Sequence, residues 1–422
     1  FPVDASEDTA LQAALLQQPR HVLFPAADQF SAGFGESGWR AAVRASNEHL
    51  IPRGLTLGFQ AGRAGQLTTA SIYLDTLLTA LRRQADVLAD DREVVAMVLQ
   101  LGLAEVLGAS ALGQLLDAVT QHLRTVARPQ VEVRLDAGST LAPAQLRAVG
   151  CTRLTVIDRA DALGPTLLAQ SRQVGFTARY YQLRVPSLAD QGFIERVHEV
   201  LAEAPERVLL PAPCGLPEQP AAGQWLQAWR LLGDAGYVAI GGDHYQRGDL
   251  PDPNGPGDGQ RHCDLAGVPR RDRSDFVGLG LAACSQIGEV FYRLEDDLAQ
   301  WQSRLQAGQI GVTAGLILSE QERLSAEVAQ SLACDHSVDA AAFEWRNDVA
   351  FDDCFAEAMP ALQPLLKWCV AHRVGYRVVD EADLNKLASS AHHEGVVADV
   401  LREEALPLAA WLQALPPGPA LA

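Results

Sequence analysis

Asp243, His244 and Tyr245 form the most suggestive polar cluster in the sequence. They follow an apolar run at residues 237–240 that predicts a strand, so they should lie where that strand ends. A neighbouring carboxylate orients an imidazole and raises its basicity, which suits proton transfer or ligation of a haem iron. A His beside an Asp at a strand end also serves as a structural hydrogen-bonded pair, and both interpretations stay open.

Three glycines, Gly278, Gly280 and Gly288, punctuate what we expect to be a strand-to-helix segment. Their spacing is not the Gly-x-Gly-x-x-Gly fingerprint, so nicotinamide or flavin binding has little support. A glycine lets the backbone pack closely against a neighbour or against a ligand. Gly278 and Gly280 are therefore candidate ligand contacts, with close packing as the alternative.

The seven cysteines give no compact metal signature, because no two lie within four residues of each other. They are Cys151, Cys214, Cys263, Cys284, Cys334, Cys354 and Cys369. We expect buried small hydrophobes, and the odd number argues against a complete disulfide framework. His262-Cys263-Asp264 and His392-His393-Glu394 carry metal-capable groups, but adjacent residues point in different directions. We expect both to be surface features and predict no metal site.

Strand-like apolar runs alternate with helical periodicity over the first 240 residues. The predicted strands are residues 55–59, 94–101, 131–135, 153–157, 178–185, 207–211 and 237–240. The predicted helices are residues 72–87, 111–126, 143–149, 163–174, 188–204 and 225–235. Such alternation implies a parallel sheet with crossover helices.

Residues 247–274 break this pattern with turn-forming and charged residues, which predicts a long mobile loop. Residues 294–306 and 319–332 are prone to form helices. Residues 362–374, 376–380 and 384–402 suggest a helical, winged-helix-like region, and the tail after Leu415 should fray. We therefore expect an N-terminal arm (1–50), a domain built on the parallel sheet (51–295) and a helical C-terminal domain (296–422).

The composition is that of a large soluble protein. The chain has 422 residues, is 48% hydrophobic and has no apolar run near the roughly 20 residues of a membrane span. The net charge of −18 opposes nucleic-acid binding, and we expect a cytoplasmic protein. The basic residues are almost all arginine, which suits carboxylate recognition, although a genome-wide preference would give the same count. The chain begins at Phe1, which favours a trimmed N-terminus and leaves a lost targeting segment open.

Several segments, taken in chain order, match one known family. They are residues 19–30 (PRHVLFPAADQF), Tyr73-Leu74-Asp75, residues 150–154 (GCTRL), residues 174–177 (VGFT), and most strongly residues 236–245 (GYVAIGGDHY) and 277–288 (VGLGLAACSQIG). In these segments the chain resembles the oxygen-independent coproporphyrinogen III oxidases, radical S-adenosylmethionine enzymes of haem biosynthesis. The resemblance implies an α/β fold: an open, partial parallel (β/α) barrel with a smaller, mainly helical C-terminal domain.

The family's catalytic apparatus does not carry over. The family binds a [4Fe–4S] cluster through Cys-x-x-x-Cys-x-x-Cys, but residues 53–74 of this chain contain no cysteine. The family's glycine-rich turn is matched only by residues 99–105. Arg159 and Gln182 stand where the family has polar residues that contact the cosubstrate, and Glu132 is a candidate for a retained one. We therefore expect cluster and S-adenosylmethionine to be lost, the space near residues 59–67 to collapse, and Arg63 to turn to solvent or pair with a carboxylate.

The sequence thus predicts a pseudoenzyme without catalytic residues. It would bind a tetrapyrrole such as haem or a porphyrin precursor, or regulate haem metabolism as the partner of an active paralogue. The expected ligand-binding residues are Asp243, His244, Tyr245, Gly278, Gly280 and Glu132. The alternatives are an active oxidase, which would decarboxylate coproporphyrinogen III oxidatively, and a protein-binding scaffold with a filled barrel.

Overall fold

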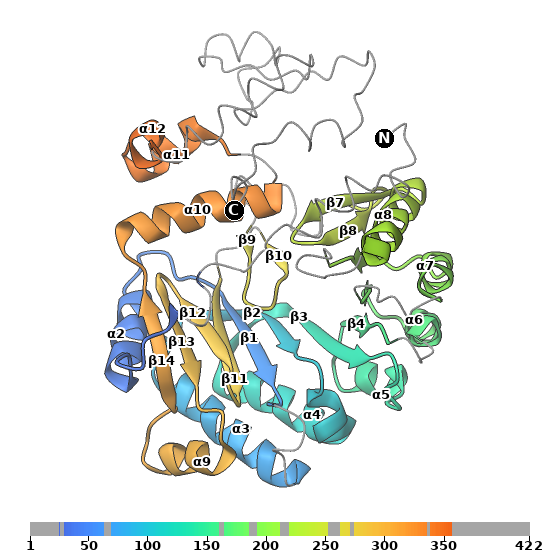
Figure 1. Ribbon diagram of the computed structural model, residues 1–422. Helices are drawn as coiled ribbons and strands as arrows, with labels where there is room; N and C mark the ends of the chain where they lie inside the picture. The colour runs from blue at the N-terminus through green and yellow to red at the C-terminus, as the bar shows by residue number, and fades with distance from the viewer. Residues whose placement is uncertain are drawn as a thin grey trace.

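A twelve-stranded sheet is the centre of the molecule (Figure 1). The computed structural model describes residues 25, 29–62, 69–159, 164–184, 192–211, 219–251, 262–270, 274–335 and 338–356. The strand order is β14-β13-β12-β11-β1-β2-β3-β4-β5-β6-β8-β7, and β9 and β10 form a separate hairpin.

The strands are β1 (Leu55–Gln60), β2 (Glu93–Leu99), β3 (Arg124–Asp136), β4 (Arg153–Ile157), β5 (Ala178–Gln182), β6 (Arg207–Leu209), β7 (Tyr237–Gly241), β8 (His244–Arg247), β9 (His262–Cys263), β10 (Pro269–Arg270), β11 (Asp275–Gly280), β12 (Cys284–Ile287), β13 (Val290–Leu294) and β14 (Val312–Ile317). The helices are α2 (Glu36–Asn47), α3 (Ala70–Ala85), α4 (Leu103–His122), α5 (Pro143–Ala148), α6 (Gly164–Gln173), α7 (Phe193–Ala202), α8 (Gln219–Asp234), α9 (Leu298–Gln306), α10 (Glu320–Asp335), α11 (Ala340–Asn347) and α12 (Phe351–Cys354).

The middle of the sheet is parallel and its two ends are antiparallel. Strands β11 and β1 to β6 run parallel, while β8 and β7 at one end and β12 to β14 at the other pair antiparallel. The first and last strands of this order, β14 and β7, are not paired with each other, so the sheet is open. The expected α/β fold with an open, partial parallel barrel is confirmed.

Alternation along the strands separates an apolar outer face from a polar inner face. Leu57 on β1, Val133 on β3 and Val156 on β4 join the core that the helices cover. Their neighbours point the other way, and we call the side on which Glu132 and Arg134 lie the inner face. Strand and helix order thus leaves one face of the sheet to carry polar groups.

A buried ion pair joins the amino ends of the central parallel strands. Arg92 Nη2 lies 2.7 Å from Asp275 Oδ2, and Ser46 Oγ donates to the same oxygen at 2.6 Å. Arg92 Nε also donates to Arg53 O at 3.1 Å. Because Arg92 precedes β2 and Asp275 begins β11, this network holds the starts of the central strands in register.

The seven strands expected from the sequence all exist, and six of them have ends within three residues of those expected. The seventh, β3, begins seven residues earlier, at Arg124, where the sequence predicted the end of a helix. The helix expected at residues 111–126 begins earlier, at Leu103. Gly108 has φ 72° and ψ 164° inside it, and this kink interrupts the helical periodicity ahead of residue 111.

Two expectations about connections are wrong. Residues 277–288 do not lead from a strand into a helix, because β11 turns into the antiparallel strand β12. Residues 247–274 are not one long loop, since β9 and β10 pair through Cys263 and Pro269. The sheet also continues past residue 295, because β14 pairs with β13.

Helix α4 is the one described helix long and apolar enough to cross a membrane by length and composition. Leu112, Leu115 and Val119 on it are buried in the core. The segments predicted at residues 362–402, the tail after Leu415, His392-His393-Glu394 and Arg63 lie outside the described residues.

Candidate functional site

Polar side chains form a row across the inner face. Cα pairing places Arg134, Thr155, Tyr180, Arg207 and Gln246 side by side on β3, β4, β5, β6 and β8. The next row toward the ends of the parallel strands is Asp136, Ile157, Gln182, Leu209 and His244. His244 therefore lies at the carboxyl edge of the sheet, where barrel folds place their sites.

The turn between β9 and β10 reaches this row. Arg134 Nη2 donates to Ala266 O at 2.8 Å, and His244 Nε2 lies 2.8 Å from Gly267 O. Asp264 holds the turn, because its Oδ1 accepts from Ala266 N at 2.9 Å and from Val268 N at 3.0 Å. Two inner-face side chains thus end on carbonyls of one hairpin, which lies between the strand ends and α10 (Figure 1).

His244 is buried and neutral. A carbonyl can only accept, so Nε2 carries the proton and Nδ1 keeps a lone pair. Nδ1 is fully buried and has no hydrogen-bond partner among the described residues. Burial and then the positive charge of Arg207 hold the pKa of His244 well below its usual range. The imidazole is therefore a neutral base with one unused nitrogen.

Glu132 is buried and already paired. Its Oε1 accepts from Arg134 Nε and from Thr155 Oγ1, each at 2.9 Å. Burial alone raises the pKa of Glu132, but Arg134 and Thr155 outweigh it and lower the pKa to about 2. The carboxylate is ionised at neutral pH, and an internal guanidinium neutralises it.

Arg207 is the second inner-face cation. It is buried, its guanidinium carbon lies 4.9 Å from the centroid of the Tyr180 ring, and its Nη2 lies 3.5 Å from Gln246 Oε1. Arg134 on β3 and Arg207 on β6 both act on His244 electrostatically, so two sequence-distant strands place charges around one imidazole on a third.

The structure brings together Glu132 and His244 but not the other predicted ligand residues. Tyr245 is next to His244 on β8 and so points to the outer face, where it packs against the core. Asp243 sits in the turn before β8 with φ 63°. A Cβ on Gly278 would lie 2.3 Å from Cys284 O, and one on Gly280 would lie 2.1 Å from Gln60 O. Close backbone packing thus accounts for both glycines.

The residues after β1 do not fit the family's iron–sulfur cluster. Residues 53–74 contain no thiol, and Ala61, at the end of β1, is buried. The Tyr73 hydroxyl donates to Gln60 O and accepts from Leu281 N at 3.2 Å, while Gln60 Nε2 donates to Leu281 O at 3.0 Å. The side chains of Tyr73 and Gln60 therefore form hydrogen bonds at the strand end where the family's cysteine loop begins.

The other residues that the resemblance singled out, Arg159 and Gln182, lie near the carboxyl edge of the sheet, and Gln182 is in the same row as His244. Arg159 is half-exposed and pairs with Asp136 at 3.4 Å, and the backbone carbonyl of Gln182 accepts from Asp158 N at 2.8 Å. His262-Cys263-Asp264 was expected at the surface, but Cys263 and Asp264 are buried under the hairpin contacts. That expectation is wrong. Of the cysteines, Cys151, Cys263 and Cys334 are buried as expected, and Cys284 and Cys354 are partly so.

Sequence reasoning missed Arg134 and Arg207. A signal existed on β3, where Gln130, Glu132, Arg134 and Asp136 alternate with apolar residues. This pattern of period two indicates a strand with one polar face. No local signal identifies Arg207, because its neighbours on the inner face come from other strands.

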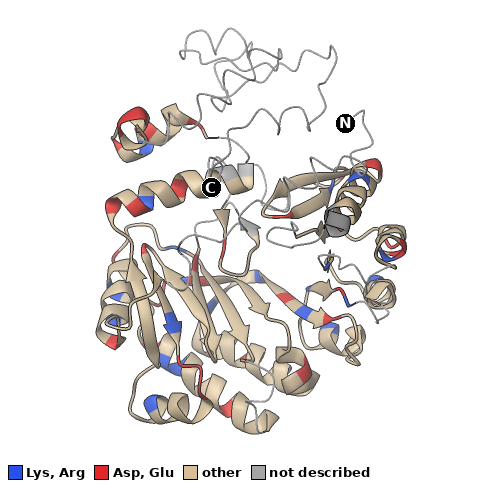
Figure 2. Cartoon of the chain, viewed as in Figure 1, with Lys and Arg blue, Asp and Glu red and all other residues tan. Residues whose placement is uncertain are grey.

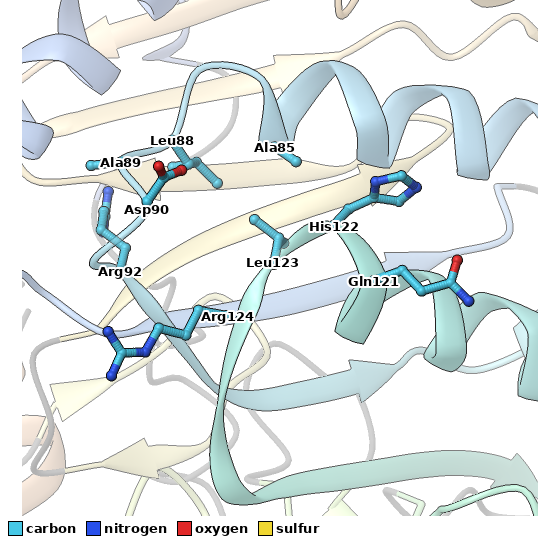
Figure 3. A pocket seen from close by; sticks show the side chains of 9 residues that line it. All are labelled: Ala85, Leu88, Ala89, Asp90, Arg92, Gln121, His122, Leu123 and Arg124. Carbon is cyan, nitrogen blue, oxygen red and sulfur yellow. The ribbon is translucent and has the colours of Figure 1, made fainter.

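A pocket of about 320 Å³ lies at the edge of the sheet formed by the amino ends of the parallel strands (Figure 3). Leu88, Arg92, His122 and Arg124 are among its lining residues, which come from the segments that precede β2 and β3 and from the first residue of β3. It lies at the amino ends of the parallel strands, away from His244.

A family model for part of the chain concerns RNA. Residues 354–405 match the family described as "RNA 2'-O ribose methyltransferase substrate binding". Almost all of these residues lie outside the part that the structure describes.

Whole-chain relatives give a different comparison. An oxygen-independent coproporphyrinogen III oxidase from Escherichia coli is 24% identical over 393 residues, which cover 83% of this chain and 86% of that protein. The oxidase of that name from Pseudomonas aeruginosa is 29% identical over 195 residues, 42% of each chain.

The fold agrees with these relatives. The solved structure of coproporphyrinogen III oxidase from Escherichia coli, described as a radical SAM enzyme, superimposes with a TM-score of 0.68 at 23% identity. The match covers 82% of this chain and 90% of that one. The resemblance expected from the sequence is therefore confirmed: the chain is similar to the oxygen-independent coproporphyrinogen III oxidases over most of its length and has the fold of a radical S-adenosylmethionine enzyme.

Proposed function

We propose that this chain is a non-catalytic relative of the coproporphyrinogen III oxidases that binds a tetrapyrrole on the inner face of its sheet. The observation that carries the proposal is the Glu132–Arg134 ion pair. In the resembling family Glu132 would read the cosubstrate, whose sulfonium and ammonium groups are cations. Here Arg134 Nε lies 2.9 Å from Glu132 Oε1 and already pairs with this carboxylate. A cationic cosubstrate would have to compete with this guanidinium, which belongs to the protein itself.

The same face suits an anionic ligand. Arg134 and Arg207 lie where the family carries its chemistry, and with Glu132 they leave one net positive charge there. Guanidinium groups pair bidentately with carboxylates. A porphyrin that carries propionates supplies such carboxylates around a flat apolar ring. His244 Nδ1 adds a lone pair suited to a metal in that ring.

The hairpin between β9 and β10 sets a condition on binding. Ala266 O and Gly267 O now accept from Arg134 and His244, and His244 Nδ1 is buried, so the turn must move before a ring can reach these side chains. In this proposal the site opens only when the ligand binds, and the free energy needed to move the turn lowers the affinity for the ligand.

Titration with coproporphyrin III and with haem tests the proposal. We expect saturable binding of both, seen as a Soret shift, because both carry carboxylates for the arginines. His244→Ala should weaken haem binding and leave coproporphyrin III binding within about twofold, since only haem offers iron to Nδ1. Arg207→Gln should weaken both by about tenfold, the effect of losing one charge-assisted contact.

Tyr245→Phe is the matched control, because its side chain lies on the outer face beside His244 in sequence. It should bind both tetrapyrroles as wild type does. Failure of either tetrapyrrole to saturate the protein contradicts the binding proposal and favours a protein-binding scaffold or a regulatory partner of an active paralogue. Equal haem affinity of wild type and His244→Ala removes His244 from the ligand contacts.

An active oxidase is the rival function, and the similarity to the curated oxidases supports it as well. It requires cysteines from elsewhere in the chain to hold a cluster, because none lies in residues 53–74. Conversion of coproporphyrinogen III to the divinyl product by the reconstituted protein would establish it.

A second candidate function is contact with RNA through residues 354–405. The family match over these residues favours it. The net charge of −18 opposes it, and acidic side chains are spread over the helices around the sheet (Figure 2). Filter binding with a folded RNA at low salt decides: saturable binding that weakens as salt rises supports this candidate, and no binding dismisses it.

A further inference from the structure

Cys263 and Cys334 bring two buried thiols into contact. Their Sγ atoms lie 3.3 Å apart, although 71 residues separate them in sequence. Cys263 is 6% exposed and Cys334 is 1% exposed. A disulfide needs about 2.05 Å, so the sulfurs must approach by about 1.2 Å more.

The pair joins two different elements. Cys263 is on β9 and Cys334 lies near the end of α10. Gln330, one turn before Cys334, accepts a hydrogen bond from Cys263 N at 2.9 Å, so a second contact holds the strand and helix at the same place. The end of α10 also meets the turn after β7, where Gly242 N donates to Ala333 O at 3.1 Å.

A disulfide between Cys263 and Cys334 would restrain the β9–β10 hairpin. Cys263 is the last residue of β9, and the turn that follows it contacts Arg134 and His244. A covalent link from Cys263 to α10 would fasten that hairpin over the inner face. In the reduced protein the same hairpin is held by hydrogen bonds and by the packing of its buried residues, such as Val268.

We propose that Cys263 and Cys334 form a reversible disulfide with each other. The oxidant is a low-molecular-weight disulfide such as glutathione disulfide. One protein thiolate attacks a sulfur of glutathione disulfide and releases one glutathione thiolate. The second protein thiolate then attacks the mixed disulfide and releases the other. The two protons of the protein thiols end on the two glutathione molecules, and two protein thiols are oxidised as one glutathione disulfide is reduced.

Burial makes this reaction slow in the folded protein. The hydrogen bond with Cys334 and burial both raise the pKa of Cys263, so the thiolate is scarce until the hairpin opens. Oxidation should therefore take hours in the native protein and should proceed readily when the chain refolds in the presence of the oxidant.

The test maps the bond in the full chain after native incubation and after refolding in glutathione redox buffer. After thiol alkylation, trypsin releases Cys263 in residues 262–270 and Cys334 in residues 324–346. We expect one cross-linked species of these two peptides, a Tm raised by at least about 3 °C, and loss of both on reduction. Cys263→Ser and Cys334→Ser should each abolish the cross-link.

Cys151→Ser is the matched control, because Cys151 is an equally buried thiol for which no sulfur contact is found among the described residues. It should leave the cross-link and the Tm shift unchanged. Two alkylated thiols at Cys263 and Cys334 after oxidative refolding, or a stable glutathione adduct on either one, would overturn the proposal. Porphyrin binding plays no part in this readout.

Discussion

His244 shows how one residue can be fixed by its surroundings rather than by its sequence neighbours. Its sequence partner Asp243 was expected to orient it, but the hydrogen bond runs from Nε2 to Gly267 O on a distant hairpin. Arg207 and Arg134 face it from β6 and β3, and Glu132 adds the one opposing charge. A buried neutral imidazole between two guanidinium groups resists protonation.

Acid should therefore destabilise the protein through His244. The folded-state pKa is lowered, so below about pH 6.5 the unfolded chain binds a proton that the folded chain does not. Stability then falls as pH drops, by up to about 1.4 kcal/mol per pH unit for this one group. Urea unfolding of wild type and His244→Gln at pH 7, 6 and 5 should show a steeper loss for wild type. Parallel profiles would mean that His244 titrates normally.

Glycines act at the scale of the elements, because they let strands β1, β11 and β12 pack closely. Gly280 has φ +133°, and its missing Cβ would meet the backbone of Gln60. Sequence reasoning offered ligand contact and close packing as alternatives, and could not decide between them. The decision depends on which strand lies beside β11, and nothing local to residues 277–288 specifies that.

Gly280→Ala should destabilise the protein by about 1–3 kcal/mol, since neither the backbone angle nor the neighbouring carbonyl accommodates a methyl group. Gly233→Ala is the matched control: Gly233 is on α8, and a Cβ there meets nothing within 4 Å. It should stabilise by roughly 0.5–1 kcal/mol, because alanine favours helix. Chemical denaturation measures both, and a Gly280→Ala protein as stable as wild type would show that the packing at β1 is loose.

For the whole molecule, the sequence predicted the parallel half of the sheet and missed most of its antiparallel ends. Strands such as β2, which is apolar from Val94 to Leu99 and lies between two helices, are easy to identify from the sequence. Strands β12 and β13 are only four and five residues long and join through Gly288 and Glu289. Such short runs resemble loop or helix, and only pairing with β11 and β14 makes them strands.

The site was predictable in the same uneven way. The sequence singles out His244 and Glu132 because chemistry-bearing residues stand out at strand ends or by resemblance, and their part in ligand binding stays a prediction. Arg134 and Arg207 were missed because their roles come from register across five strands. The hairpin that covers them falls in residues 262–270, where the charged, turn-rich sequence indicated only a loop.

The central claim, that the chain has the oxidase fold without the oxidase chemistry, is tested most directly by anaerobic reconstitution with iron and sulfide. We expect no stable cluster and no reductive cleavage of S-adenosylmethionine, because residues 53–74 hold no thiol and Arg134 neutralises Glu132. Iron and acid-labile sulfide near about four per chain, together with release of 5′-deoxyadenosine, would contradict the claim and establish an active radical enzyme.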